Sequence, residues 1–328
     1  MKKPSKNGAK SSDSISLNMD EYMTCIVANQ KTYDAVTSGT AFRFAYNRAK
    51  TWKAWIWGIT FVFAVLQTGT SAFAFSNGTP TIDPTPFVVS FLLASVIAGS
   101  FGKQKVEKWQ NTGCLLQRLH DFAVMNVGIK PTHIELPKAK VIALSKKRLI
   151  KVPEDRNILQ TWWSESLAIV PFPVAKVIAA YSTFSWESAL RKQYQTLLIL
   201  LLTASIAIPL LLALFLDYTI SQTIIFTFAP FTPFISVVLD ELLSNKKSLI
   251  IAEALTIECH STWANVVAGK LTDSEIENTT ELHMNSWQSF RQSATPIFEW
   301  LYNQSRNNME MSMIINTGAL VDEFNSKK

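Results

Sequence analysis

Four long stretches of the sequence carry no charged side chain, and they constrain the fold more than any other feature. They comprise residues 54–75, 84–102, 193–216 and 218–239. A helix needs about 20 mostly apolar residues to cross a bilayer, and each stretch has about that length. We therefore predict an all-α integral membrane protein, with four transmembrane helices in two hairpins, rather than a soluble protein with four buried helices.

Lysine and arginine residues flank only one end of each stretch. They cluster before residue 54, after residue 102, before residue 193 and after residue 239, whereas the connections at residues 76–83 and at Asp217 contain none. Short loops rich in Lys and Arg stay in the cytoplasm. The pattern predicts that both termini and the central segment are cytoplasmic and that two small loops face outside.

The remaining sequence reads as ordinary helical protein. Two local signals mark helix starts, a capping box at residues 272–275, "TDSE", and Thr295 followed by Pro296, which predicts an N-cap with proline in the first helical position. We expect a mainly helical cytoplasmic domain. The predicted division is a disordered basic tail (1–20), a cytoplasmic N-terminal helix (21–53), a first transmembrane hairpin (54–102), a cytoplasmic helical segment (103–192), a second hairpin (193–239) and C-terminal cytoplasmic helices (240–328).

The junction before the third stretch contains no helix-breaking residue. No Gly or Pro occurs between Ser182 and Ile208, although the sequence changes there from polar to apolar. This predicts one stiff helix that joins the cytoplasmic part to the membrane. Proline kinks a helix, and it serves either as a hinge or as a fixed feature of shape. The candidate transmission or gating residues are Tyr194, Pro209, Pro230 and Pro233.

The sequence contains no recognisable catalytic or metal-binding motif. There is no Walker loop, GxGxxG, HExxH or GxSxG sequence, and the three cysteines and four histidines lack metal-ligand spacing. The net charge of +6 is concentrated beside the apolar stretches, which fits a membrane surface better than nucleic acid. We expect no metal, no cofactor, no DNA or RNA partner and no enzymatic activity. For an enzyme, His120 and Asp121 would be the residues to test.

A basic patch in the central segment leaves three interpretations open. Lys146, Lys147 and Arg148 belong to "PKAKVIALSKKRLIKVPEDR". They could hold ligand phosphates, contact anionic lipid head groups or form a solvated face. Trp186 could likewise stack on a ligand base or belong to the core.

Three further sequences resemble one known family. "LLQRLHDFAVM", "WWSESLAIVPFPVAKVIAAYSTFSWESALRKQY" and "RQSATPIFEWLYNQSRNNMEMSM" are similar to the SMODS-associating four-transmembrane effector family (S-4TM). The chain departs from the family at "AAYSTFS" before Trp186, where relatives carry a more polar segment. The matching positions are Gln117, Asp121, Trp186, Leu190, Arg191, Tyr194, Arg291, Pro296, Tyr302, Arg306, Glu310 and Met311.

The resemblance implies a bacterial antiphage effector in the inner membrane. Such a protein would respond to a cyclic oligonucleotide made by a partner nucleotidyltransferase, would assemble as a homo-oligomer, and would disrupt the membrane or form a pore, causing abortive infection. The competing hypothesis is a passive membrane anchor that recruits a cytosolic partner. For the effector, the candidate ligand-binding residues are Lys146, Lys147, Arg148, Trp186, Arg191, Arg291 and Arg306.

Overall fold

A computed structural model describes residues 25–75 and 85–327, and in these ranges the chain is helical and contains no strand. The all-α prediction is confirmed. In chain order the elements are α1 (Ile26–Asn29), α2 (Tyr33–Phe75), α3 (Thr85–Met125), α4 (Lys138–Lys151), α5 (Asp155–Gln160), the 3-10 turn η2 (Glu165–Ile169), α6 (Phe172–Phe215), α7 (Ile220–Thr223), the π-helical turn η3 (Ile224–Phe228), α8 (Ala229–Val267), α9 (Asp273–Ser293) and α10 (Glu299–Ser326).

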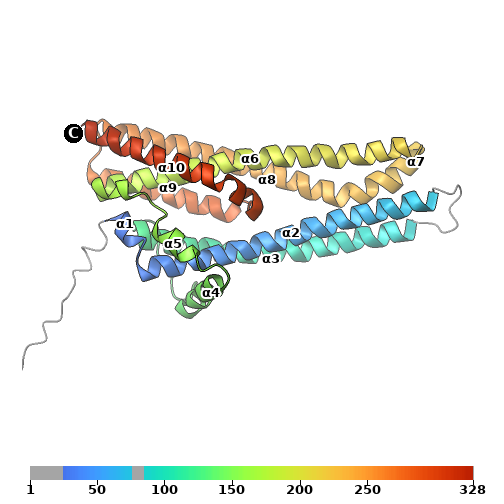
Figure 1. Cartoon of the computed structure of the whole chain (residues 1–328), viewed down its shortest axis with the longest axis horizontal. Helices are drawn as coiled ribbons and strands as arrows, with labels where there is room; N and C mark the ends of the chain where they lie inside the picture. Colours follow the sequence, from blue (N-terminus) through green and yellow to red (C-terminus); the bar gives the residue numbers. More distant parts are fainter. Residues whose placement is uncertain (1–24, 76–84, 328) are drawn as a thin grey trace, which may run out of the picture.

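Four long helical runs form the frame of the molecule: α2, α3, α6 and the continuous run of α7, η3 and α8. They contain 41 to 48 residues, about twice the length that crosses a bilayer. Figure 1 shows α2 beside α3 and α6 beside α8. The C-terminal end of α2, the N-terminal end of α3 and the turn between α6 and α7 lie at one end of the molecule. The charged halves of these helices, with α1, α4, α5, α9 and α10, form the other end. We call these two parts the membrane bundle (54–75, 85–102 and 193–239) and the head.

The surface of the membrane bundle is apolar. Leu200 and Phe215 are 63% and 87% exposed, and Phe61, Leu66 and Phe101 are also exposed. Monomeric soluble proteins rarely present so continuous an apolar surface. Together with the helix lengths, this confirms the prediction of a multi-pass membrane protein with four spanning helices.

Helix α6 passes from head to membrane bundle without interruption. Its first half lies in the core of the head, where Val174, Ile178 and Phe184 are buried against α8 and α9. Its second half contributes to the membrane bundle and contains Pro209. The predicted stiff junction is therefore present. The predicted domain borders at residues 53, 102, 192 and 239 all fall inside continuous helices, so they stay predictions about where the membrane begins.

Of the two predicted helix starts, one is present and the other is not. The capping box is present: Thr272 Oγ1 accepts from the Glu275 N–H, and the Glu275 carboxylate accepts from the Thr272 N–H at 2.8 Å. However, Thr295 and Pro296 do not begin the last helix. Residues 294–298 are non-helical and α10 starts at Glu299, because the carbonyls of Thr295 and Pro296 accept hydrogen bonds from other helices.

Pro230 does not lie in the middle of a regular α-helix. It is the second residue of α8, which continues the π-helical turn η3 without a break. The N–H of the preceding Ala229 donates to the Ile224 carbonyl in the π-helical pattern. Pro233 does lie inside α8.

Candidate ligand-binding site

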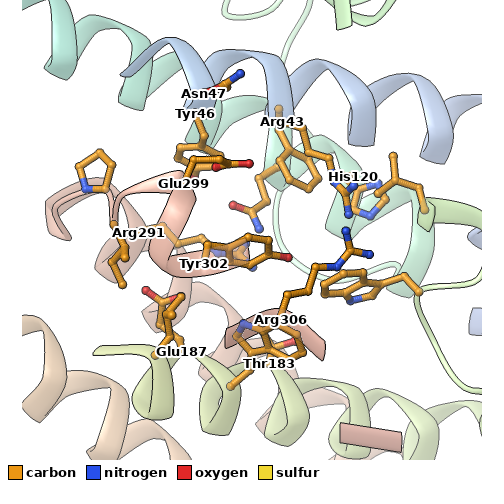
Figure 2. Close-up of a pocket in the computed structure, with 18 of the residues that line it drawn as sticks. Arg43, Tyr46, Asn47, His120, Thr183, Glu187, Arg291, Glu299, Tyr302 and Arg306 are labelled. Atoms are coloured by element: carbon orange, nitrogen blue, oxygen red, sulfur yellow. The ribbon is translucent and has the colours of Figure 1, made fainter. Parts of the chain in front are cut away.

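The head contains a cavity of about 770 Å³, a size typical of ligand pockets. Its walls come from α2, α3, α4, α5, α6, α9 and α10 and from the segment between α9 and α10. Figure 2 shows Arg43, His120, Tyr302 and Arg306 converging on this space from three helices and the other labelled residues around it.

One face of α2 lines the cavity with polar side chains. Tyr46, Asn47 and Lys50 follow Arg43 by three, four and seven residues, which places them on a single helix face. From the sequence, this region was expected only to flank the membrane with basic residues. The spacing of the polar residues is the feature that could have indicated the wall of a site.

Two arginines share one buried carboxylate at the edge of the cavity. Asp155 is 2% exposed and accepts from Arg43 Nη1 at 2.8 Å and from Arg148 Nε. Arg306 pairs with Glu310 at 2.5 Å. Burial is the largest single influence and lowers the pKa of Arg306, but the hydrogen bond and the charge of Glu310, together with Tyr302 and Asp155, raise this pKa overall. The two arginines around Asp155 carry one positive charge more than the carboxylate neutralises.

Aromatic rings form a continuous wall beside these cations. The ring centroids of Trp162 and Trp186 are 5.6 Å apart, and those of Trp186 and Tyr302 are 6.3 Å apart. Arg43 lies 5.6 Å from the centroid of Trp162, and Lys50 lies 5.3 Å from that of Tyr302. Burial raises the pKa of Tyr302, so the phenol stays neutral and can donate a hydrogen bond. The site thus combines cations, flat rings and a neutral donor.

The opposite wall is the C-terminal end of α9. Arg291 is paired with Asp121 and lies 5.2 Å from the centroid of Trp287. Gln110 of α3 donates to three carbonyls of this wall, those of Arg291, Gln292 and Ala294. One side chain therefore holds the end of α9 against α3.

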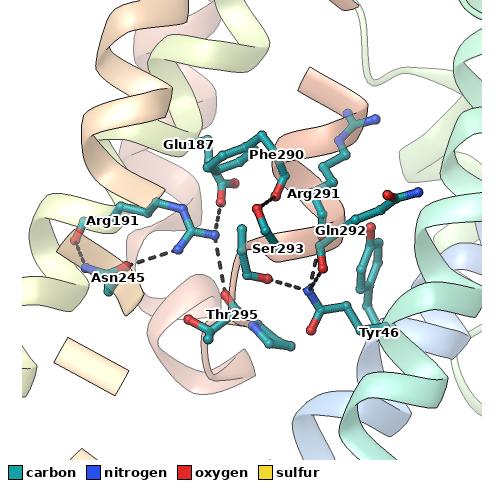
Figure 3. Close-up of polar contacts among 12 residues, drawn as sticks. Tyr46, Glu187, Arg191, Asn245, Phe290, Arg291, Gln292, Ser293 and Thr295 are labelled. Carbon is teal, nitrogen blue, oxygen red and sulfur yellow. Dashed lines mark hydrogen bonds and ion pairs between the residues drawn. The ribbon is translucent and has the colours of Figure 1, made fainter. Parts of the chain in front are cut away.

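The non-helical residues 294–298, which we call the connector, join this wall to the membrane bundle. Arg191 of α6 donates to the Thr295 carbonyl at 3.3 Å and to Asn245 of α8 at 3.1 Å, and it pairs with Glu187 at 2.7 Å (Figure 3). Lys53 of α2 donates to the Pro296 carbonyl at 2.5 Å. Polar bonds from the long helices of both hairpins therefore end on one short segment.

Lys53 itself lies where the membrane bundle begins. Its ammonium group donates to Glu241 of α8 at 2.5 Å and to Tyr194 of α6 at 2.9 Å, and it lies 4.7 Å from the ring centroid of Phe298. The side chains of Lys53 and Glu241 are 5% and 10% exposed. This buried cluster connects α2, α6 and α8 to the connector.

The structure brings five of the seven predicted ligand residues to the cavity: Arg148, Trp186, Arg191, Arg291 and Arg306. Lys146 lines a second, smaller pocket, and Lys147 is exposed and does not line the cavity. The guanidinium of Arg191 is occupied by three protein partners and its side chain is 3% exposed, so its position suits holding the connector. Binding by any of these residues stays a prediction.

The predicted transmission residues lie in the membrane bundle. Tyr194 is fully buried in the Lys53 cluster, Pro209 and Pro230 are buried in the membrane bundle, and Pro233 is half-buried. Arg43, Lys50 and Asp155 also line the cavity, although the sequence was not expected to place them there.

The model of one protein family, the SMODS-associating 4TM effector domain, matches residues 24–319. The chain belongs to this family. No curated protein and no solved structure matches it. The matched range includes all four long helices, the cavity and the connector of this S-4TM protein. As a member of the family, the S-4TM protein is a membrane effector in SMODS-type signalling.

Proposed function

We propose that this S-4TM protein binds a cyclic oligonucleotide in the cavity of its head and, in response, permeabilises the bacterial inner membrane as an antiphage defence. The observation that carries the proposal is the convergence of Arg43, Arg148 and Arg306 with Trp162 and Tyr302 around one cavity. The basic flanks support a cytoplasmic head, where a cytosolic messenger would reach it.

Arginine suits the phosphates of such a ligand. Its planar guanidinium forms two parallel hydrogen bonds to a phosphate. In the free protein Arg43 and Arg148 share Asp155, and Arg306 is paired with Glu310. A phosphate would compete with these carboxylates for the guanidiniums, so binding would rearrange the ion pairs that join α2 and α4 to α5 and the pair within α10.

The aromatic wall suits the bases. Trp162, Trp186 and Tyr302 present ring faces beside the cations, and bases stack on such faces in nucleotide-binding proteins. Cations without rings would suit inorganic phosphate or lipid head groups equally well. The combination favours a nucleotide.

Ligand binding must favour one conformation of the protein over another in order to act as a signal. Arg291 lines the cavity, and the connector follows it within a few residues. A shift of this wall would reach α6 through Arg191 and α2 and α8 through Lys53. We expect several copies of the chain to assemble in the active state.

The experiment is dye release from liposomes that contain the purified full-length protein, with cyclic di-AMP, 3′,3′-cyclic GMP–AMP and cyclic tri-AMP as probes. A thermal-shift measurement with the same compounds reports binding separately. Release caused by one compound that also raises the melting temperature is the expected result. Binding without release would favour the passive anchor, and no binding by any probe would contradict the assignment of the cavity to cyclic oligonucleotides.

A further inference from the structure

In the membrane bundle, α2 is polar on its inner face and apolar on its outer face. Thr60, Gln67, Thr68 and Ser71 are all at most 5% exposed. The outward side chains of the same turns are apolar and 43% to 50% exposed: Phe61, Val62, Val65 and Leu66. This distribution is the reverse of that in a water-soluble helix, and it concentrates polar groups between the helices.

Three of these buried polar groups have an oxygen without a hydrogen-bond partner. They are Gln67 Oε1, Thr68 Oγ1 and Ser71 Oγ. By contrast, Thr60 donates to the Ile56 carbonyl at 2.9 Å, within its own helix. A polar group buried without a partner destabilises a folded protein, and lipid offers it none. Water is the partner that such oxygens ordinarily find.

The three residues lie in the interior between the hairpins. Thr68 and Ser71 follow Trp57 by about three and four helical turns, and Trp57 packs against Phe234 of α8 at 5.9 Å between ring centroids. Gln67 is turned toward the side of α2 on which Phe63 meets Phe91 of α3, at 5.3 Å. The three polar side chains of α2 therefore face the space between α3 and the second hairpin.

The second hairpin supplies a further polar group to this interior. Pro209 is buried in α6, and a proline inside a helical run leaves the carbonyl four residues earlier without its helical partner. That carbonyl belongs to the buried residue Ser205. The turn η3, which contains Phe226, also packs against α2.

We infer that Gln67, Thr68 and Ser71 form a hydrated site between the two hairpins, and that this site is the wall of a path for ions across the membrane. The assignment of an ion path rests on the proposed function, whereas the hydration of the site does not. Apart from Asp217 in the turn of the second hairpin, the residues of the membrane bundle include no Lys, Arg, Asp or Glu. Charged rings are what usually select ions by sign, so this wall would conduct small hydrated ions with little preference between K⁺ and Cl⁻.

Hydration is tested in the resting protein without any nucleotide. Thr68→Cys is compared with Leu66→Cys, which lies at nearly the same depth on the exposed face of α2. A charged methanethiosulfonate reagent is added on both sides of the liposome, and peptide mass spectrometry measures labelling at each position, so the native cysteines remain. The reagent needs the thiolate, which forms in water and not in lipid. We expect at least tenfold faster labelling at position 68, and equal rates would overturn the hydrated site.

The ion path is tested by K⁺ and Cl⁻ flux after addition of whichever cyclic nucleotide triggers dye release. Thr68→Val removes the buried hydroxyl, and Thr70→Val makes the same change at an exposed position two residues away. We expect Thr68→Val to reduce both fluxes about tenfold without lowering the melting temperature, and Thr70→Val to leave them unchanged. Labelling of Thr68→Cys combined with undiminished flux in Thr68→Val would overturn the path.

A wild-type protein that gives no flux with any probe would instead contradict the proposed function. In that case the thiol labelling still decides whether the site is hydrated, so the two failures are distinguishable.

Discussion

Asp155 is the residue on which the charge of the cavity depends. It is buried, it lies at the start of α5, and it holds one arginine from α2 and one from α4. Loss of Arg43 would still leave the carboxylate paired with Arg148. The sensing role of Arg43 can therefore be examined without leaving a buried charge unpaired.

We predict that Arg43→Ala weakens binding of the activating cyclic nucleotide by roughly 10- to 150-fold, the loss expected for a hydrogen bond to a charged group. Isothermal titration calorimetry in detergent measures the change. Arg48→Ala is the matched control, since Arg48 lies on the same helix but is exposed and does not line the cavity. Equal affinities of the two variants would remove Arg43 from the site.

The Lys53–Glu241 pair gives a second prediction at this scale. Lys53→Met should destabilise the protein by about 3–5 kcal/mol, because the Glu241 carboxylate would stay buried without its cation. The double variant Lys53→Met/Glu241→Leu should recover most of that loss. Denaturant unfolding in detergent compares the variants, and a double variant no more stable than Lys53→Met would show that the pair is not coupled.

At the scale of elements, the connector has polar ties to three other helices. Gln110, Arg191 and Lys53 all donate to carbonyls in or beside it. Because these donors come from three helices, a rigid-body movement of any one helix has to stretch or move the connector.

Gln110→Ala is predicted to reduce nucleotide-triggered dye release several-fold while leaving nucleotide affinity unchanged. The variant loses the three hydrogen bonds that hold the end of α9 to α3. Gln104→Ala, at an exposed position of the same helix, should behave as wild type. Parallel loss of affinity and release would instead place Gln110 in the binding site.

A Gly-Ser insertion directly after Tyr194 tests the continuity of α6. Two extra residues turn the following helix by about 200°, which moves the buried Leu198 out of its contacts. We expect binding to survive and release to be abolished, as measured by thermal shift and dye release. The same insertion after Asp217, in the short turn of the hairpin, is the control and should retain most of the release.

The long helices could be predicted from the sequence, whereas the connector and much of the cavity could not. Uncharged apolar stretches determine a membrane helix locally, residue by residue. The connector instead depends on Gln110, Arg191 and Lys53, which approach it only after the helices have packed. Thr295 and Pro296 satisfied a local rule for a helix start, and tertiary hydrogen bonds to their carbonyls overrode it. The spacing of Arg43 and Lys50 indicates one face of a helix, but no spacing in the sequence relates Asp155 or Trp162 to that face.

At the scale of the whole molecule, the head and the turn between α6 and α7 lie at opposite ends (Figure 1). The long helices extend about 30 to 40 Å beyond the length that a bilayer requires. The head is therefore built from the same helices that span the membrane, and in the proposed function these helices would carry movement from one part to the other.

We predict that Asp217→Cys reacts with an impermeant maleimide on intact spheroplasts, whereas Ser286→Cys reacts only after lysis. Asp217 lies in the turn of the second hairpin, and Ser286 is exposed on α9 in the head. The reagent is detected by a gel shift of the protein. The reverse pattern would place the head outside the cytoplasm, where a cytosolic messenger does not reach it.

The arginines of the cavity are already paired with Asp155 and Glu310. In the proposed function the active protein would harm its own cell, and these carboxylates would guard against activation without a signal. A stray phosphate compound would have to displace a carboxylate that is covalently part of the protein. A messenger with several phosphates would displace the carboxylates together. The same ion pairs would weaken the response to a trace of messenger and would let a bacterium keep the effector in its membrane through ordinary growth.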